Sequence, residues 1–379
     1  MDKNFNYIPL IRYANYVYEL NPNVNLVNQI KNTFLFDWDL KINPSAKVLF
    51  FQSLDREDYN NFSELIFSTI DDKTKKHTFI KKKKKKNFNA LLYNLPKYFE
   101  LYKSLKYIKN KKKRFFIFFY LIDLLKLLYQ LKSLKPKIVI THADMQAIEN
   151  IIVQFFKNKN IQTITLQHGL YIDYSKEPNI NEVNYTNVVS NYFLAWGEET
   201  RNLIQKYHPS CKVKTLGNPT IIQKEIHPMD YFVVVFEHEG NKKYNFILLD
   251  IARDISKKLK LPIKIKLHPR NIFKEYDINR EEVIKHDEVY NAKFAIGHTS
   301  TMLYQLLRND IPIFKLKSNS PCNKTEQKFI FSNKTDLLLK IKNPANINHE
   351  KEGEFYIKYT QKEAINKYHD FFNKILSKA

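Results

Sequence analysis

The chain has 379 residues, which is long for a single hydrophobic core, so we expect two domains of ordinary size. Its formal net charge of +23 predicts an anionic partner, such as a membrane surface, a nucleic acid or a phosphorylated ligand. The two cysteines, Cys211 and Cys322, give neither a disulfide framework nor a metal spacing. This excludes a disulfide-stapled secreted domain and favours a reduced, cytoplasmic setting.

The N-terminal residues lack the basic-then-apolar order of a signal peptide. No apolar run reaches the roughly 18 residues that are needed to span a bilayer. We therefore expect a cytoplasmic protein that does not cross the membrane.

Residues 46–51 predict an early buried strand. Residues 55–134 then form a basic, aromatic segment without glycine, which we interpret as an insertion. It contains six consecutive lysines at 81–86 and a second basic run at 111–114, which is followed directly by aromatic and leucine residues at helical spacing. This combination is typical of a protein that binds an anionic leaflet; the alternative is a solvated loop beside a core helix. We expect peripheral association with the inner face of the cytoplasmic membrane.

Short apolar stretches and helical patterns alternate from residue 136 onward, in two series. In the first, strands are expected at 137–140, 162–166, 192–196 and 212–216, with helices at 145–156 and 198–207. In the second, strands are expected at 231–236, 263–267, 294–296 and 311–314, with helices at 244–259 and 302–307. This rhythm predicts βαβ units and parallel sheets.

A proline-bearing stretch near residues 219–230 separates the two series. We therefore divide the chain into an N-terminal Rossmann-like acceptor domain, a C-terminal Rossmann-like donor domain and a terminal helix that packs back on the first domain. The boundaries are 1–222, 228–350 and 354–379.

Polar residues follow two strands of the second series. His268 comes directly after 263–267, and Gly297 to Thr301 lie between strand 294–296 and the next helix. Open α/β sheets bind ligands at the carboxyl ends of their strands, and a helix start offers free N–H groups to an anion. We expect His268 and Ser300 to stand at the ends of adjacent strands and to converge on one phosphate.

Glycine is scarce in this chain, which holds six where average usage near 7% would give roughly 26. Four of the six fall in strand-end loops, at Gly169, Gly217, Gly240 and Gly297. Ordinary turn chemistry explains any one of them, but the set favours loops that form a site.

Four short motifs can now be compared with known families: Gln167-His168-Gly169, Gly217-Asn218-Pro219, His268-Pro269-Arg270 and Thr299-Ser300-Thr301. Their order, between about residues 138 and 316, resembles GT-B-fold glycosyltransferases. His268-Pro269 and Ser300-Thr301 resemble the HP and paired-hydroxyl motifs of bacterial sialyltransferases and polysialyltransferases. The set also resembles polyol-phosphate transferases of the teichoic-acid type. The resemblance implies an α/β fold of GT-B type, with two Rossmann-like domains facing a central cleft.

The sialyltransferase resemblance implies that His268 donates a hydrogen bond to the leaving nucleotide phosphate. Glu237-His238-Glu239-Gly240 is similar to the acidic-acidic-glycine motif of those enzymes, with His238 at the second acidic place. It makes Glu239 the catalytic base, with Glu237 next. In the polyol-phosphate resemblance His168 is the base instead, because a neutral imidazole can accept a hydroxyl proton.

The remaining candidate residues are expected to bind the nucleotide or the acceptor and to take no direct part in the reaction. Phosphate or nucleotide contacts are expected from Arg270, Gly297, His298, Thr299, Ser300, Thr301 and Asn218. Acceptor contacts are expected from His142, Asp144 and Gln167, which stand at two other strand ends.

Both families use cytidine nucleotides, so the resemblance implies a CMP- or CDP-linked donor and a glycan or lipid-linked acceptor. The product would be a capsule or lipooligosaccharide glycan, with a sialic-acid-like sugar as one option and CDP-polyol phosphate transfer as the alternative. No strand-end loop holds an Asp-x-Asp, and neither a zinc spacing nor a Gly-rich phosphate loop is present, so we expect no metal and no cofactor.

The competing class is a basic nucleic-acid-binding protein without enzymatic activity. The lysine runs are confined to one segment, and no recognition-helix or RNA-binding signature is present. We therefore expect no nucleic-acid partner.

Overall fold

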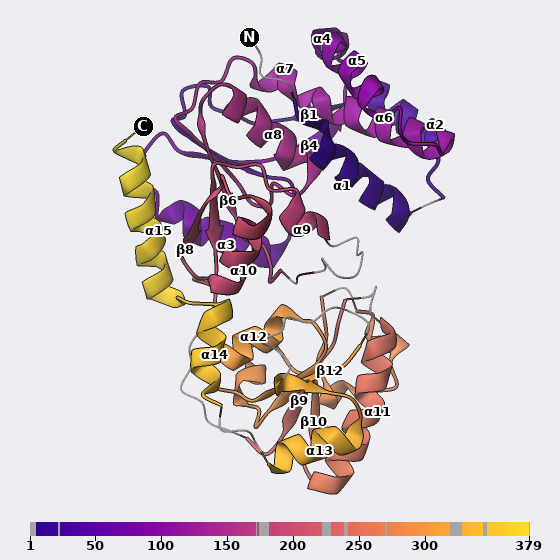
Figure 1. The fold of residues 1–379 in the computed structure, drawn as a ribbon, viewed down its shortest axis with the longest axis vertical. Helices are drawn as coiled ribbons and strands as arrows, with labels where there is room; N and C mark the ends of the chain where they lie inside the picture. The colour runs from indigo at the N-terminus through magenta and orange to yellow at the C-terminus, as the bar shows by residue number, and fades with distance from the viewer. Residues whose placement is uncertain are drawn as a thin grey trace.

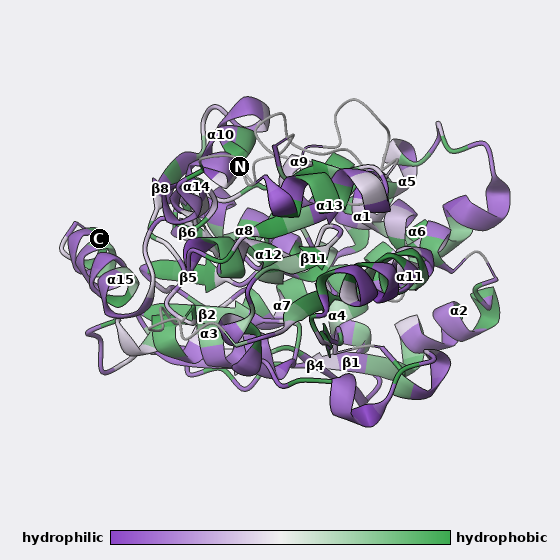
Figure 2. Ribbon diagram, turned by 90° about the horizontal axis from the view of Figure 1, so that it is seen from below, coloured by the Kyte–Doolittle hydropathy of each residue, from purple (hydrophilic) through white to green (hydrophobic). Residues whose placement is uncertain are grey.

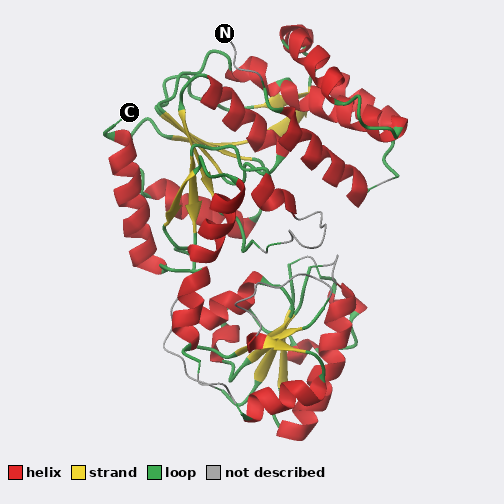
Figure 3. Ribbon diagram, viewed as in Figure 1, coloured by secondary structure: helices red, strands yellow, loops and turns green. Residues whose placement is uncertain are grey.

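A computed structural model describes residues 5–21, 23–171, 173, 182–221, 229–238, 242–269, 271–318, 328–343 and 347–378. The chain forms two α/β domains, one above the other in Figure 1, each built around a parallel sheet. Figure 3 shows the two groups of strands with helices packed around each. The expected domain boundary at residues 222–228 lies outside the described residues.

The first sheet has six parallel strands. In spatial order they are β3 (Lys76–Phe79), β2 (Val48–Gln52), β5 (Ile138–Thr141), β6 (Gln162–Leu166), β7 (Tyr192–Ala195) and β8 (Lys212–Thr215). The helices that follow its strands are α3 (Glu57–Ser68), α8 (Ala147–Asn158), α9 (Val183–Thr186) and α10 (Glu198–Tyr207). A helical layer adds α1 (Tyr7–Leu20), α2 (Leu26–Leu35), α4 (Phe88–Tyr93), α5 (Leu95–Ser104), α6 (Lys111–Leu125) and α7 (Leu127–Leu131).

The second sheet has five parallel strands. In spatial order they are β10 (Ile263–Lys266), β9 (Phe232–Val235), β11 (Ala295–Gly297), β12 (Ile313–Leu316) and β13 (Ile330–Phe331). Its helices are α11 (Lys242–Leu259), α12 (Thr301–Arg308) and α13 (Lys334–Lys342), with short 3-10 turns at η3 (Phe273–Glu275), η4 (Arg280–Glu282) and η5 (Glu288–Asn291). The chain ends in α14 (His349–Tyr356) and α15 (Gln361–Leu376).

The central strands are continuous apolar runs because helices cover both faces of each sheet. Successive side chains of β2 point to opposite faces, as the strand period of two requires. Val48 and Phe50 pack in the cluster that holds α3 and α15, whereas Leu49 and Phe51 pack with α1, α6, α7 and α8. Both faces of the sheet are therefore hydrophobic interior.

The segment expected to be a basic insertion at 55–134 contains part of the sheet. Its first helix, α3, follows β2 directly, and β3 pairs with β2 at the edge of the sheet. The sequence suggested only a polar basic stretch there, because polar residues interrupt the apolar residues of α3. The buried residues of α3 are Phe62, Ser63 and Ile66.

The lysine run is not a free loop over its first four residues. Lys81 to Lys84 form β4, which pairs antiparallel with β1 (Phe36–Asp39). Lys83 pairs with Asp39 at 2.6 Å, Lys81 with Asp55 at 3.2 Å, and Lys82 with the buried Asp123. These aspartates partly neutralise the strand.

The expectation of a single terminal helix within residues 354–379 is wrong, because α14 and α15 are two separate helices. The chain leaves the helix at residues 357–360, where backbone groups bond to loops of the first domain. Lys358 N donates to Trp196 O at 2.9 Å, and Asn218 N donates to Tyr359 O at 2.8 Å. These partners lie in another domain, so local periodicity could not reveal the break.

The two terminal helices therefore pack on different domains. α14 lies on α12, with the rings of Tyr304 and Tyr356 4.6 Å apart. α15 lies on α3, where Tyr368 meets Phe62 edge-on at 6.5 Å. One hydrophobic cluster runs through both domains along this path. Among the described residues, no helix is both long and apolar enough to cross a bilayer.

Candidate functional site

Two imidazoles stand at the carboxyl ends of β5 and β6. His142 and His168 follow these neighbouring strands, and their ring centres lie 6.4 Å apart. Burial is the main cause that holds the pKa of His142 well below 6.5, and it lowers the pKa of His168 to about 4 with help from Arg56. Both rings are therefore neutral near pH 7, and a neutral ring can accept a proton.

Each imidazole has one nitrogen held by a neighbouring hydroxyl. His142 Nδ1 lies 3.1 Å from Ser63 Oγ, and His168 Nδ1 lies 2.9 Å from Tyr171 Oη. Among the described residues, the buried Nε2 of His142 has no hydrogen-bond partner. A buried polar atom without a partner carries a desolvation cost, and such atoms occur at functional sites.

Helix α3 completes this cluster with residues that the sequence pattern did not single out. The Tyr59 ring lies 4.6 Å from His142 and 6.2 Å from His168, centre to centre. The Arg56 guanidinium lies over the Tyr59 ring, 3.7 Å from its centre. The available signal was the position of α3 directly after β2, since a helix that follows a strand begins at the ligand-binding edge of the sheet.

Three other candidates of the first domain hold loops together. Gln167 is fully buried; its Oε1 accepts from Trp196 N at 2.6 Å and its Nε2 donates to Gly169 O at 2.8 Å. Asn218 Oδ1 accepts from the amide and hydroxyl of Thr220, at 2.9 and 2.8 Å. These side chains shape the loops beside the imidazoles.

Asp144 is also a buried loop tie. Its Oδ2 accepts from the amides of Val189 and Ser190 at 2.9 and 3.0 Å. Burial nevertheless raises the pKa of Asp144 to about 6. Its role as an acceptor ligand stays a prediction.

At the carboxyl end of the second sheet, Glu237 fixes the loop before α12. The carboxylate is buried and accepts from Thr299 N at 2.7 Å and from Thr299 Oγ1 at 3.0 Å. Asn271 donates to Glu237 O at 3.1 Å and accepts from His268 N at 2.9 Å. Glu237 thus connects three strand-end loops. Because the amide and the hydroxyl of Thr299 both donate to Glu237, this threonine already has its hydrogen-bond partner.

His298 lies deep in the same loop. Tyr244 stacks on its ring at 4.1 Å, and His298 Nε2 is hydrogen-bonded to Ser318 Oγ. Burial, with Lys315 and Lys243 nearby, lowers the pKa of His298 to about 4. The neutral, enclosed ring supports the shape of the loop.

The expectation that His268 and Ser300 stand at the ends of adjacent strands is wrong. β9 lies between β10 and β11, so the two residues are separated by two strand spacings, about 10 Å. His238, which follows β9, lies next to His268, and the two rings meet edge-on at 5.2 Å. Their convergence on one phosphate stays a prediction that needs side-chain reach from both sides.

The start of α12 meets the loop that carries His168. Ser300 is the N-cap residue of α12, and its Oγ accepts from Met302 N at 3.4 Å. The next hydroxyl, Thr301 Oγ1, accepts from Leu170 N of the first domain at 3.4 Å. Leu170 follows His168 by two residues, so the strand-end loops of the two sheets are in contact.

The glycines have mostly structural explanations. Gly217 has a φ of +80°, and a Cβ there would meet Tyr359 backbone at 2.0 Å. A Cβ on Gly297 would meet Leu303 at 2.9 Å, so this glycine allows α12 to pack closely and is not needed for a turn. Gly169 alone, among the described glycines, has nothing within 4 Å.

Three sequence-predicted residues, Glu239, Gly240 and Arg270, lie outside the described residues. Within the part of the chain that the structure describes, no group of three histidine, cysteine, aspartate or glutamate side chains could hold a metal ion.

Comparison with known proteins identifies the fold but no family. No family model and no curated relative match this chain. The chain is similar to UDP-N-acetylglucosamine 2-epimerase from Rickettsia bellii, at a TM-score of 0.53 and 16% identity over 88% of this chain and 96% of that one. The fold is of GT-B type.

Two further solved structures have the same arrangement. UDP-GlcNAc 2-epimerase from Neisseria meningitidis, bound to UDP-GlcNAc, gives a TM-score of 0.52 at 15% identity over 88% of this chain and 100% of that one. The S. aureus MnaA-UDP co-structure gives 0.51 at 14% over 87% and 96%. Identities this low establish the fold alone, and the resemblance to sialyltransferases and teichoic-acid-type enzymes stays a prediction.

Proposed function

We propose that this chain is a glycosyltransferase that moves a sugar from a nucleotide-activated donor to a hydroxyl group of a glycan acceptor. The contact between Leu170 and Thr301 carries the proposal. It joins the loop that carries His168, whose imidazole is neutral, to the hydroxyl-rich start of α12. Glycosyl transfer needs these two functions next to each other: a base for the acceptor hydroxyl and a stabiliser for the departing phosphate.

His168 is the base in this proposal. Its Nδ1 lies 2.9 Å from Tyr171 Oη, so Nε2 is the nitrogen that would take the acceptor proton. In the neutral tautomer that this role requires, Nδ1 carries the proton and donates to Tyr171 Oη, which leaves the lone pair on Nε2. Burial raises the pKa of Tyr171 well above 10, so the phenol stays protonated, accepts this hydrogen bond through its oxygen and fixes the orientation of the ring. His142, in contact with Tyr59 at 4.6 Å, lines the same space for the acceptor.

The start of α12 receives the leaving phosphate. The N–H groups at a helix start attract an anion, and Ser300 Oγ stands at that position. Thr299 is held by Glu237, and Thr301 by Leu170, so the two hydroxyls flanking Ser300 already have partners. His268 would approach from the far side of β9 and donate to the leaving oxygen.

Glu237 has a supporting role in this arrangement. A carboxylate that accepts the Thr299 amide and hydroxyl fixes the loop that presents the phosphate site. The other acidic candidate for the base, Glu239, lies outside the described residues.

The donor and the place of action complete the proposal. The motif resemblance favours a CMP- or CDP-linked donor and a capsule or lipooligosaccharide acceptor at the inner face of the cytoplasmic membrane. The solved structures of similar fold instead hold UDP or UDP-GlcNAc, which makes a uridine donor the direct competitor. Transfer of a polyol phosphate from a CDP-polyol is the alternative with the same cytidine preference.

A nucleotide-sugar 2-epimerase is the second candidate. Two of the three similar solved structures described above are named as UDP-GlcNAc 2-epimerases. An epimerase needs no acceptor, since it changes the configuration of the donor sugar itself. Conversion of UDP-GlcNAc by this chain alone would favour this candidate over transfer.

The test is a thermal-shift panel with CMP, CDP, UDP and GDP, followed by donor turnover with and without a glycan acceptor. We expect a rise in Tm with a cytidine nucleotide, and release of that nucleotide only when acceptor is present. A rise in Tm with UDP alone would exclude the resemblance to families that use cytidine nucleotides. The GT-B fold and a nucleotide-sugar donor would still stand. The absence of a shift with every nucleotide would overturn the proposed function.

A further inference from the structure

Helix α5 has two apolar faces, of which the protein covers only one. Leu101 is fully buried, and Tyr98 packs against the same core. On the other face, Leu95, Phe99 and Tyr102 are 45%, 69% and 55% exposed. Their spacing of four and three residues places them in one stripe along the helix. An exposed aromatic stripe of this length marks a surface that binds something.

The stripe continues onto neighbouring helices. On α4, Phe88 and Leu92 are exposed one turn apart. On α6, Phe118 meets the Tyr102 ring edge-on at 6.0 Å, and Phe115 is exposed one turn earlier. Helices α5 and α2 both pack on α6 at the edge of the first domain, where Figure 2 shows apolar and polar residues interleaved.

Charge on this face has one dominant sign. Residues 95–114 hold eight lysines and arginines and one acidic residue, Glu100. Lys103 follows Phe99 by four residues and lies next along the same face of α5, and Lys106 lies in the turn that directly follows the helix. Both lysines are exposed. The face thus combines aromatic side chains with cations, which is the composition that suits the headgroup region of an anionic leaflet.

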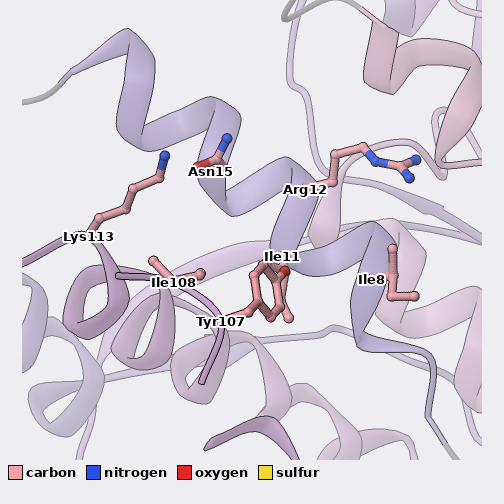
Figure 4. Close-up of a pocket in the computed structure, with 7 residues that line it drawn as sticks. All are labelled: Ile8, Ile11, Arg12, Asn15, Tyr107, Ile108 and Lys113. Carbon is pink, nitrogen blue, oxygen red and sulfur yellow. The ribbon is translucent and has the colours of Figure 1, made fainter. Parts of the chain in front are cut away.

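A cavity of about 360 Å³ opens beside this face, between α1 and the turn that joins α5 to α6. Ile8, Ile11, Tyr107 and Ile108 line its apolar part. Figure 4 shows Lys113 and Asn15 pointing to the same side of α1, with Tyr107 near Ile11. The lining therefore pairs an apolar wall with basic groups.

Arg12 also lines this cavity. Its Nη1 donates to Thr186 O at 2.9 Å and to Asn187 Oδ1 at 3.1 Å. Among the described residues no carboxylate pairs with Arg12, whereas Lys113 pairs with Glu19 at 2.6 Å. Arg12 therefore brings an uncompensated positive charge to the cavity.

Two other parts of the basic segment do not fit this role. The first four lysines of the run belong to β4, where Asp55, Asp123 and Asp39 pair with Lys81, Lys82 and Lys83. The leucines of α6 and α7 are core residues, fully or almost fully buried. The membrane contact that the sequence suggested for the lysine run is therefore better placed on another face of the first domain.

We propose that the α4–α5–α6 face, with Phe99, Tyr102, Lys103 and Lys106 at its centre and the Arg12 cavity beside it, docks on an anionic phospholipid bilayer. The aromatic rings enter the headgroup region while the lysines pair with lipid phosphates. This inference rests on the peripheral placement in the proposed function and names the surface responsible for it. A lipid-linked acceptor would then reach the first domain from the membrane side.

Vesicle sedimentation of the full chain tests the proposal, with phosphatidylcholine vesicles and with vesicles holding 30% phosphatidylglycerol. Two double variants remove one component each: Phe99→Ser with Tyr102→Ser, and Lys103→Gln with Lys106→Gln. Matched controls on α11 are Phe246→Ser with Ile247→Ser, and Lys257→Gln with Lys258→Gln, which change exposed residues of the same kinds. Circular dichroism confirms that each variant is folded.

We expect salt-sensitive binding to the anionic vesicles only. The lysine pair should weaken it about thirtyfold and the aromatic pair about tenfold or more, while both controls bind as the wild type does. Equal binding by the α5 variants and the wild type, or no wild-type binding, would overturn the proposal. So would a 20-nucleotide oligonucleotide that displaces the protein from vesicles, which would make nucleic acid the occupant. Thermal shift with nucleotides, done without lipid, reports on the proposed function separately.

Discussion

The two strand-end clusters face each other but differ in how their polar groups are used. In the first domain, His142 and His168 are neutral rings among aromatic residues, and His142 Nε2 has no partner among the described residues. In the second, Glu237 and His298 are tied to Thr299 and Ser318. A group that must move a proton needs a free lone pair, whereas a group that orients a loop needs fixed partners. This difference is the reason why we propose proton chemistry in the first domain and phosphate binding in the second.

Removing His168 should have the largest effect. His168→Asn keeps a polar side chain of similar size but removes the basic nitrogen, so we expect kcat to fall by about 10³-fold. Steady-state kinetics with saturating donor measures it. His286→Asn, on an exposed histidine of the second domain, is the matched control and should leave kcat unchanged. A kcat within threefold of wild type would end the assignment of His168 as base.

His268→Ala should lower kcat by roughly 10²-fold, on the scale of losing one positioned donor to the leaving oxygen. Ser300→Ala should have a smaller effect, mainly on nucleotide affinity. Because Thr299 and Thr301 already have partners, neither is free to replace Ser300. If the His268→Ala and Ser300→Ala effects simply add, the two side chains do not share a ligand, and the second half of the comparison fails.

Thr301→Val removes the hydrogen bond between the two clusters while preserving the shape of the side chain. A neutral hydrogen bond contributes about 0.5–1.5 kcal/mol, and this one is long at 3.4 Å. We therefore expect kcat/KM to fall by about two- to fivefold. Thr335→Val, near the start of α13, provides the control. Unchanged kinetics in Thr301→Val would show that the two loops need no direct contact to work together.

The pH profile should show the smallest effect. The pKa of His168 is lowered to about 4, so the base stays active until the pH falls towards 4, and kcat/KM should lack an acid limb near 6.5. Arg56→Gln removes one cause of the lowered His168 pKa, so the acid limb of the profile should move to higher pH. At pH 5 we expect kcat/KM of this variant to be about twofold lower than that of the wild type. A wild-type limb near 6.5 would mean that the ring is open to water.

Acid should also destabilise the fold through the same rings. His142 and His168 titrate near 6.5 in the unfolded chain but at lower pH in the folded one. The stability that they contribute is present above pH 6.5 and is lost as the pH falls towards 4, because only the unfolded chain then binds the protons. Thermal unfolding at pH 7 and pH 5 measures this loss.

The sequence allowed the fold to be predicted wherever the signal was local. Strands such as Ile138–Thr141 and Phe232–Val235 are short apolar runs, and their period and spacing indicate parallel sheets. The break at residues 357–360 was missed because its backbone groups bond to Trp196 and Asn218, far away in the chain. The spatial order of β9, β10 and β11 was missed for the same reason, since strand order is set by packing and not by periodicity.

The candidate site was predictable in position more than in role. Histidines after strands were visible as motifs, and the structure places His142 and His168 together. Tyr59 was not visible, because its segment looked like a basic insertion. The functions of Gln167 and Glu237 as loop ties depend on partners that only the folded chain brings within hydrogen-bond distance.

Nucleotide affinity in two variants tests the division between the domains most directly. Isothermal titration calorimetry with the nucleotide that stabilises the wild type would compare His168→Asn with His268→Ala. The account predicts that His168→Asn binds the nucleotide within about twofold of wild type although turnover is lost, whereas His268→Ala binds it more weakly. The reverse pattern, with nucleotide affinity lost in His168→Asn and retained in His268→Ala, would contradict the account.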